Sequence, residues 1–189
     1  MQYIQYDDPI MIGIDSRIDL NATSPAMFEV VSKNNVIDIP IDNIKLDNIL
    51  QTYYPQYTVL SWRTYGGIIA YTPSDFGFGL YVNISNHAIE RIAYNLAVII
   101  QNVSGQEATI KGNDIIVHDY KVCGMSWQPI EGNQDFCLFS AVISIDPDIQ
   151  LIEELVGVPN KPVQGLKSFC DISRDDIKDA IVDNIEYFV

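Results

Sequence analysis

Basic residues are scarce in this sequence. Its 189 residues include 11 lysines and arginines against 25 aspartates and glutamates, so the formal net charge at pH 7 is −14. Sequence-independent binding to DNA or RNA needs a field of lysine and arginine that displaces counterions from the phosphates. Docking to an anionic membrane surface needs a similar basic patch. The composition therefore predicts a protein that binds neither nucleic acid nor membranes.

Long apolar runs are absent as well. No stretch approaches the roughly 18 apolar residues that a membrane-spanning helix needs. Residues 1–8 lack the basic start and apolar run of a secretory signal, so we expect a cytoplasmic protein. Hydrophobic residues make up 48% of the chain and charged residues 19%, a balance typical of a globular protein with a packed core. The length predicts one domain over residues 1–189.

Cysteine is rare too. Cys123, Cys137 and Cys170 are odd in number and lack the C-x-x-C spacing typical of structural zinc sites. A zinc site that combines them with His118 is therefore disfavoured. We expect three reduced, partly buried thiols.

The hydrophobic pattern predicts an α+β fold. Segments rich in β-branched and aromatic residues predict strands at 10–14, 27–31, 57–62, 67–71, 78–84, 108–110, 114–117, 121–127 and 136–145. Apolar residues at helical spacing predict helices over 41–52 and 85–101, from Pro147 to Gly157, and after Ser173. Ser85 is a candidate N-cap of the second helix, and Gly105 is expected to end it. Ser173 with Asp176 resembles a capping box for the last helix.

One segment with chemical character surrounds Arg63. It continues into Gly66-Gly67 between two apolar strands, which brings bare backbone N–H groups beside a fixed cation. Such a turn is able to approach a carboxylate or phosphate closely, because glycine has no Cβ in the way. The alternative is an ordinary hairpin turn with an exposed arginine.

A second segment contains Asn113-Asp114 and, after a predicted hairpin, Lys121 followed by Gly124. Asp114 is able to hold Mg²⁺ or a ribose, and Lys121 is a point charge suited to a phosphate oxygen. The alternative is that Asp114 caps a turn and that Lys121 is a solvated residue at a strand edge.

Together and in this order, the segments resemble the catalytic domain shared by lipoate–protein ligases and biotin protein ligases. In that family an arginine and a Ser-Gly-Gly-Gly loop precede an apolar strand and a helix, and Asn-Asp-(Ile/Leu), a Lys-x-x-Gly hairpin and a long apolar strand follow. The matching features within residues 59–177 are Arg63, Gly66-Gly67, the helix over 85–101, Asn113-Asp114-Ile115, Lys121-Val122-Cys123-Gly124 and the strand over 136–145. The segment 161–177 resembles the tail of lipoate ligases. The resemblance implies an α+β domain with a mixed, largely antiparallel sheet packed with helices.

The resemblance also implies an adenylation reaction. Lipoate, octanoate or biotin would attack the α-phosphate of ATP with Mg²⁺, release pyrophosphate, and pass to a lysine of a lipoyl or biotinyl carrier domain. The catalytic position is matched by Lys121, where negative charge builds on the acid and the phosphate. Substrate and adenylate positions are matched by Arg63, Gly66, Gly67, Asn113, Asp114 and Gly124, and Asp114 is also the metal candidate. Carrier domains of this kind are usually acidic, and the sequence shows no basic cluster that would receive one.

Several positions depart from the family pattern. Tyr65 and Ile68 replace a serine and a glycine of the loop, Thr72-Pro73 stand in place of His-Asp, and Phe139-Ser140 in place of His-Gly. A second interpretation is therefore a catalytically inactive protein with this fold, used as a structural or interaction module beside other protein subunits. A third is an unrelated α+β domain whose motifs are coincidental.

Overall fold

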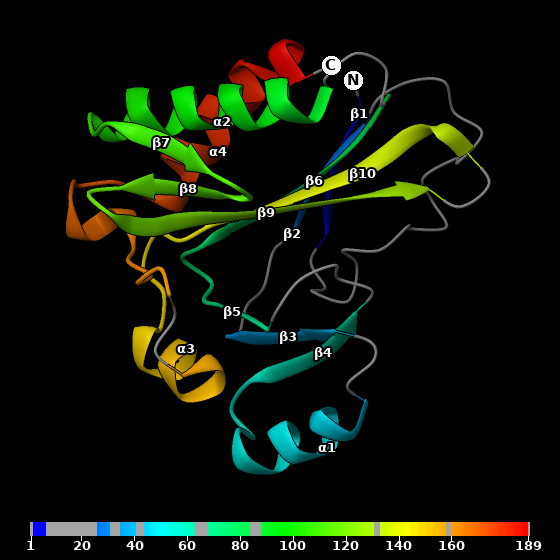
Figure 1. Cartoon of the computed structure of the whole chain (residues 1–189), viewed down its shortest axis with the longest axis vertical. Helices are drawn as coiled ribbons and strands as arrows, with labels where there is room; N and C mark the ends of the chain where they lie inside the picture. Colours follow the sequence, from blue (N-terminus) through cyan, green and yellow to red (C-terminus); the bar gives the residue numbers. More distant parts are fainter. Residues whose placement is uncertain are drawn as a thin grey trace.

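Two sheets of different size organise the structure, a computed structural model that describes residues 2–6, 26–30, 35–40, 44–62, 68–83, 88–130, 133–157 and 160–188 (Figure 1). The strands are β1 (Gln2–Tyr6), β2 (Ala26–Val30), β3 (Val36–Pro40), β4 (Thr58–Trp62), β5 (Ile69–Tyr71), β6 (Phe76–Asn83), β7 (Ala108–Lys111), β8 (Asp114–Val117), β9 (Tyr120–Ile130) and β10 (Asn133–Ile143). The helices are α1 (Ile44–Tyr53), α2 (Ala88–Ser104), α3 (Ile149–Val156) and α4 (Arg174–Asp183), with the short 3-10 helices η3 (Leu166–Ser168) and η4 (Ile185–Phe188).

The larger sheet has the strand order β1-β2-β6-β10-β9-β8-β7, and the smaller sheet has the order β4-β3-β5. All neighbours in the larger sheet are antiparallel except β1 and β2, which run parallel. In the smaller sheet β3 runs parallel to β4 and antiparallel to β5. The expected α+β class, with a mixed and largely antiparallel sheet packed with helices, is confirmed.

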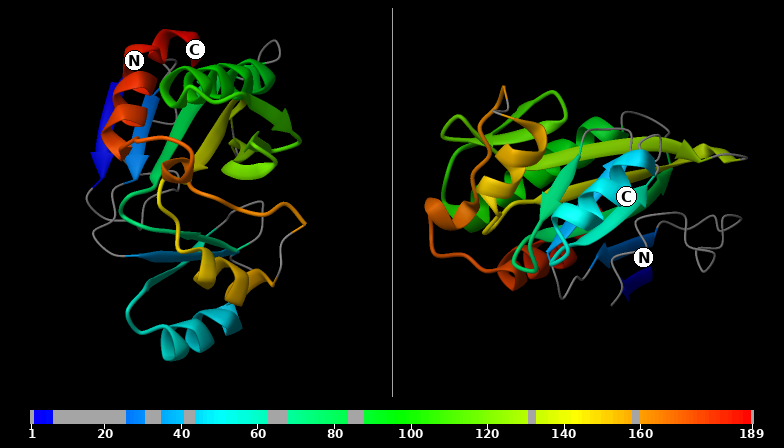
Figure 2. Two further views of the ribbon diagram at one scale, coloured as in Figure 1. Left: turned by 90° about the vertical axis from the view of Figure 1, so that its left-hand side faces the viewer. Right: turned by 90° about the horizontal axis from the view of Figure 1, so that it is seen from below.

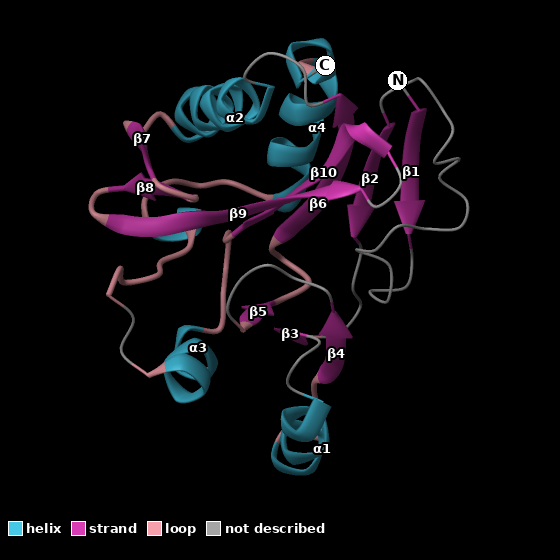
Figure 3. Cartoon of the chain, turned by 45° about the vertical axis from the view of Figure 1, so that its right-hand side comes forward, coloured by secondary structure: helices cyan, strands magenta, loops and turns pink. Residues whose placement is uncertain are grey.

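The main core lies between the larger sheet and the helices α2 and α4, which pack side by side against it (Figure 3). Leu80, Leu96, Phe139 and Ile177 are among its fully buried side chains. Burial of each such side chain contributes about 1.5–3 kcal/mol to the stability of the fold. The long antiparallel β9–β10 pair belongs to this sheet, and β8 and β7 continue it beyond β9, so the hairpins of that edge extend from the main sheet.

A second, smaller core belongs to the three-stranded sheet. Ile37, Leu50 and Leu151 are buried there, where α1 and α3 pack against β4 and β5. Figure 2 shows α1 and α3 at the end of the molecule away from α2. None of the helices in the described part of the chain is long and apolar enough to cross a membrane.

The buried carboxylate of Asp75 fastens the start of β6 to the chain that leaves β10. It accepts hydrogen bonds from the backbone N–H groups of Thr72 at 2.8 Å, Ile145 at 2.7 Å and Asp146 at 3.1 Å, and from the Thr72 hydroxyl at 3.2 Å. Burial raises the pKa of Asp75 above its ordinary value of 3.8, although these hydrogen bonds lower it. The contact joins two segments 70 residues apart.

The sequence pattern located most of these elements. All four predicted helices are confirmed, and the capping box is present, with Ser173 Oγ accepting from Asp176 N–H at 3.2 Å and Asp176 Oδ2 accepting from Ser173 N–H at 2.8 Å. Helix α2 runs three residues beyond its predicted end at 101, and Gly105 follows it with a φ of 68°. The predicted strand at 10–14 and the N-cap Ser85 lie outside the described residues. The strands β1 and β3 were not predicted.

Candidate active site

The β7–β8 hairpin positions Asp114. Gly112 and Asn113 form its turn, and Gly112 has a φ of 68°, a conformation that glycine adopts without steric cost. Asp114 therefore begins β8 opposite Lys111, with its side chain only 17% exposed. Asn113 is exposed, and its carbonyl oxygen accepts from the N–H of Met125 at 2.8 Å. The turn is thereby tied to β9.

The next hairpin brings Lys121 to the same place. Its two-residue turn, 118–119, has positive φ at both positions, 48° and 69°, as this tight hairpin geometry requires. The register of β8 and β9 then shifts, because Ile116 pairs with Lys121 but Asp114 pairs with Gly124. The extra residue in β9 is a β-bulge, a device that redirects side chains. It lets Lys121 and Gly124, three residues apart, meet over Asp114.

Gly124 leaves room for the lysine. A Cβ atom at this position would lie 3.1 Å from Lys121 Nζ and 3.2 Å from Lys121 Cε. The lysine side chain therefore lies across bare backbone, which gives the Lys-x-x-Gly spacing a physical reason.

Three charged side chains meet here and form what we call the lysine–aspartate cluster: Lys121, Asp114 and Lys161. Lys121 Nζ lies 2.8 Å from Asp114 Oδ1, and Lys161 Nζ lies 2.7 Å from Asp114 Oδ2. Lys161 also donates to the carbonyl oxygen of Lys111 at 2.8 Å. The side chains of Lys121 and Lys161 are 35% and 42% exposed, so solvent reaches the ammonium groups while the carboxylate between them is largely covered.

The two lysines keep Asp114 ionised. Burial raises the pKa of this carboxyl, but the hydrogen bonds and charges of Lys121 and Lys161 together lower it more, so the pKa lies below its ordinary 3.8. Two ammonium groups against one carboxylate leave the cluster with one positive charge, in a chain whose net charge is −14. A partly exposed positive surplus of this kind is suited to an anionic ligand.

The surroundings of Asp114 do not suit the magnesium role that the resemblance implies. Both of its oxygens accept from ammonium groups, and two positive charges within 2.8 Å oppose a divalent cation at the same carboxylate. Within the described ranges, no group of three or more His, Cys, Asp or Glu side chains is arranged to hold a metal ion. As placed, these residues do not fit a magnesium ion.

Most of the first predicted segment lies outside the described residues. Arg63, Gly66 and Gly67, together with Tyr65, lie outside the described residues. Their roles stay predictions. Ile68, at the end of this segment, is partly buried against the small core.

The other departures from the family pattern have structural uses. The Thr72 hydroxyl donates to the carbonyl oxygen of Asp146 at 3.1 Å and to Asp75 Oδ2 at 3.2 Å, so it stabilises the turn before β6. Phe139 is 1% exposed in the main core. Packing and turn formation therefore account for these two side chains.

None of the three cysteines forms a disulfide, and two of them are buried. Cys123 and Cys137 are buried, and Cys170 is partly exposed. Burial raises the pKa of the Cys137 thiol to about 11 and raises that of Cys123 further. Neither buried thiol is suited to act as a nucleophile at neutral pH.

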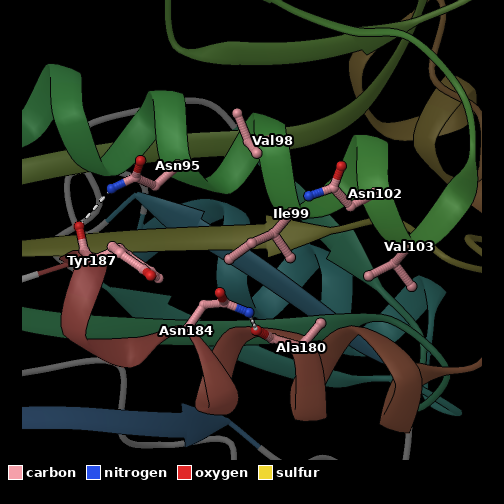
Figure 4. Close-up of a pocket in the computed structure, with 8 residues that line it drawn as sticks. All are labelled: Asn95, Val98, Ile99, Asn102, Val103, Ala180, Asn184 and Tyr187. Atoms are coloured by element: carbon pink, nitrogen blue, oxygen red, sulfur yellow. Dashed lines mark hydrogen bonds between the residues drawn. The ribbon is translucent and has the colours of Figure 1, made fainter.

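A pocket lies away from the cluster, between α2 and the α4–η4 segment (Figure 4). It has a volume of about 370 Å³ and is lined by Asn95, Val98, Ile99, Asn102, Val103, Ala180, Asn184 and Tyr187. Asn95 Nδ2 donates across it to the carbonyl oxygen of Tyr187 at 2.5 Å. Its lining contains no charged side chain, so it offers no counter-charge to a carboxylate or a phosphate. The lysine–aspartate cluster is the better candidate for anion chemistry.

The fold is that of the catalytic domains of lipoate- and biotin-protein ligases. Among solved structures, the chain is similar to a bi-partite lipoate protein ligase from Thermoplasma acidophilum, described with its E2 lipoyl domain. The TM-score is 0.79 at 13% identity, over 99% of this chain and 82% of that one. It is also similar to a lipoate-protein ligase A bound with ATP, with a TM-score of 0.72 at 15% identity, over 87% and 72% of the two chains.

A biotin protein ligase from Aquifex aeolicus in complex with biotin is similar as well, with a TM-score of 0.59 at 12% identity, over all of this chain and 71% of that one. No family model matches the sequence, and no curated protein matches it. At these identities the similarity concerns the fold, and at that level the predicted resemblance is confirmed.

Sequence reasoning missed two residues that the structure makes prominent. Lys161 begins the segment that resembles the tail of lipoate ligases, but it is not predicted as a site residue, because it lies 47 residues from Asp114 and no local pattern links them. Asp75 was not singled out, although an aspartate directly before an apolar strand is a signal for a capped turn.

Proposed function

We propose that this chain is a cytoplasmic enzyme that activates a carboxylic acid of the lipoate, octanoate or biotin type with ATP. The acyl group then passes to a lysine of a lipoyl or biotinyl carrier domain. One observation carries the proposal: the residues of the Asn-Asp and Lys-x-x-Gly motifs converge, with Lys121 lying over Gly124 and paired to Asp114 at 2.8 Å. The fold and the motif point to the same chemistry.

Lys121 is the proposed catalytic residue. In the first step an oxygen of the acid attacks the α-phosphorus of ATP, a new P–O bond forms, and the bond to pyrophosphate breaks. Negative charge builds on the α-phosphoryl oxygens, and a fixed ammonium stabilises it. A lysine ammonium has three donors, and within the described residues Asp114 is the ion-pair partner of Lys121, so further donors face the ligand.

In the second step the neutral amine of the carrier lysine attacks the acyl carbonyl. The C–N bond forms, the bond to AMP breaks, and the amine loses a proton. Exposed Asn113 and the glycine at 124 are proposed to contact the adenylate, and Arg63, Gly66 and Gly67 are proposed to bind the acid and the adenylate. The fold neighbours described with ATP, with biotin and with a lipoyl domain support this choice of substrates and partner.

Acid-dependent exchange of labelled pyrophosphate into ATP tests the first step, with lipoate, octanoate and biotin each supplied. We expect exchange with one of these acids, and we expect Lys121→Ala to lower it by about 100-fold to 1,000-fold, the usual effect of removing one charge-stabilising donor. Lys167→Ala is the matched control, because Lys167 pairs with Asp146 at 3.1 Å on an exposed surface. An unchanged rate in Lys121→Ala would refute the catalytic role.

An inactive module with this fold is the second candidate function. It is favoured by Ile68, which packs against the small core, and by Thr72, which is used in a turn, at positions where the resemblance expects ligand-binding residues. Folded protein that gives no exchange with any of the three acids would establish this alternative and exclude the ligase.

A further inference from the structure

The segment that follows α3 lies directly against the cluster. The N–H of Lys121 donates to the carbonyl oxygen of Pro162 at 2.8 Å, and the N–H of Gln164 donates to the carbonyl oxygen of Lys121 at 3.1 Å. Val163 makes a parallel bridge with Lys121. The segment therefore continues the sheet at the start of β9, where β10 has already ended opposite Cys123.

This backbone pairing determines where Lys161 projects. Its ammonium bridges two groups of the β7–β8 hairpin, the carbonyl oxygen of Lys111 at 2.8 Å and Asp114 Oδ2 at 2.7 Å. Lys161 thereby joins the hairpin that carries Asp114 to the segment that holds the backbone of Lys121. Two of its three donors are used in these contacts.

A carboxylate with one partner is free to rotate about its terminal bond. Asp114 has an ammonium on each oxygen, Lys121 on Oδ1 and Lys161 on Oδ2. The plane of the carboxylate is therefore fixed from both sides. Since Asp114 is the ion-pair partner of Lys121 within the described residues, its orientation also fixes the ammonium of Lys121 over Gly124.

We propose that Lys161 is a positioning residue, which holds the Asp114 carboxylate so that Asp114 aims the ammonium of Lys121 at the ligand. Its catalytic consequence rests on the proposed ligase function, whereas the arrangement itself does not. Lys161 acts through Asp114 and makes no contact with the reacting atoms. The segment after α3 is thereby assigned to the active site.

Kinetics of acid-dependent pyrophosphate exchange test the proposal in Lys161→Met, Lys161→Arg and the control Lys167→Met. Misplacing a catalytic group by about 1 Å costs up to about 100-fold, so we expect Lys161→Met to lower kcat about tenfold or more while KM for ATP changes less than about twofold. Lys161→Arg retains a cation that reaches Asp114 and should restore most of kcat. A rise in KM for ATP with unchanged kcat would overturn the proposal, because it would place Lys161 on the substrate.

A readout independent of activity separates this proposal from the ligase function. The pKa of Asp114, followed by carboxyl ¹³C NMR, should rise in Lys161→Met, stay low in Lys161→Arg and be unchanged in Lys167→Met. The same titration applies if the protein shows no exchange with any acid. An Asp114 pKa that does not respond to Lys161→Met would show that Lys161 does not hold this carboxylate, and would overturn the proposal whatever the activity.

Discussion

Two aspartates are held in opposite ways in this protein. Asp75 is 3% exposed and is surrounded by backbone N–H groups and one hydroxyl, whereas Asp114 is 17% exposed and lies between two lysines. Burial raises the pKa of the first, and the lysines bring the pKa of the second below its ordinary range despite its burial. Backbone N–H dipoles hold Asp75 between two chain segments, while the partly exposed ammonium groups of Lys121 and Lys161 hold Asp114 at a surface that solvent reaches. The difference distinguishes a structural carboxylate from one that we propose serves the active site.

The largest effect is expected from Asp75→Ala. This change leaves the N–H groups of Thr72, Ile145 and Asp146 without their acceptor in a buried place, and we expect a loss of about 2–4 kcal/mol in the free energy of unfolding. Urea denaturation measures it. Asp146→Ala removes only the exposed pair with Lys167 and should cost less than about 1 kcal/mol. Equal losses in the two variants would remove the structural role of Asp75.

Asp114→Asn should act on activity more than on stability. The amide keeps the shape but loses the charge that aims Lys121, so we expect kcat for pyrophosphate exchange to fall about tenfold or more. Because both lysines are partly exposed, the free energy of unfolding should change by less than about 1 kcal/mol. Asp119→Asn is the control, since Asp119 is almost fully exposed and 3.7 Å from Lys111. A stability loss as large as that of Asp75→Ala would contradict the division between the two aspartates.

The smallest expected effect is in the pH dependence of stability. Folding raises the pKa of Asp75. The contribution of this group to the free energy of unfolding is therefore full below its ordinary pKa of 3.8 and declines as pH rises through the pKa of the folded state. Folding lowers the pKa of Asp114. The contribution of this group to the free energy of unfolding is therefore present above its ordinary pKa of 3.8 and is lost as pH falls through the pKa of the folded state. Between pH 7 and pH 3, the stability difference between wild type and Asp114→Asn should shrink. The free energy of unfolding of wild type relative to that of Asp75→Asn should instead increase as pH falls. Urea unfolding at each pH measures both differences.

Local patterns predicted the parts of the site that lie close together in sequence. Asn113 ends the glycine turn and Asp114 begins the strand after it. Lys121 returns from the next hairpin, so short-range turn geometry brings these residues close together. The roles given to Arg63, Gly66 and Gly67 rest on the family resemblance and stay predictions. The strand β3 was not predicted, because five residues ending in Pro40 carry little periodic signal.

The charge distribution shows where sequence reasoning stops. The chain has no run of basic residues, and no basic cluster was expected. The fold nevertheless brings the ammonium groups of Lys121 and Lys161 together on the carboxylate of Asp114. A pattern with a period of two or 3.6 residues carries no information about a partner 47 residues away.

The α+β class, most helices and strands, and the hairpin that joins Asp114 to Lys121 and Gly124 could be read from the sequence alone. These depend on side-chain periodicity and turn residues, which act over a few positions. Two contacts became visible only in the folded chain: Asp75 joins the start of β6 to the segment after β10, and Lys161 completes the lysine–aspartate cluster. Such contacts form when packing of the whole sheet fixes distant segments side by side, so their physical cause lies in the assembled core.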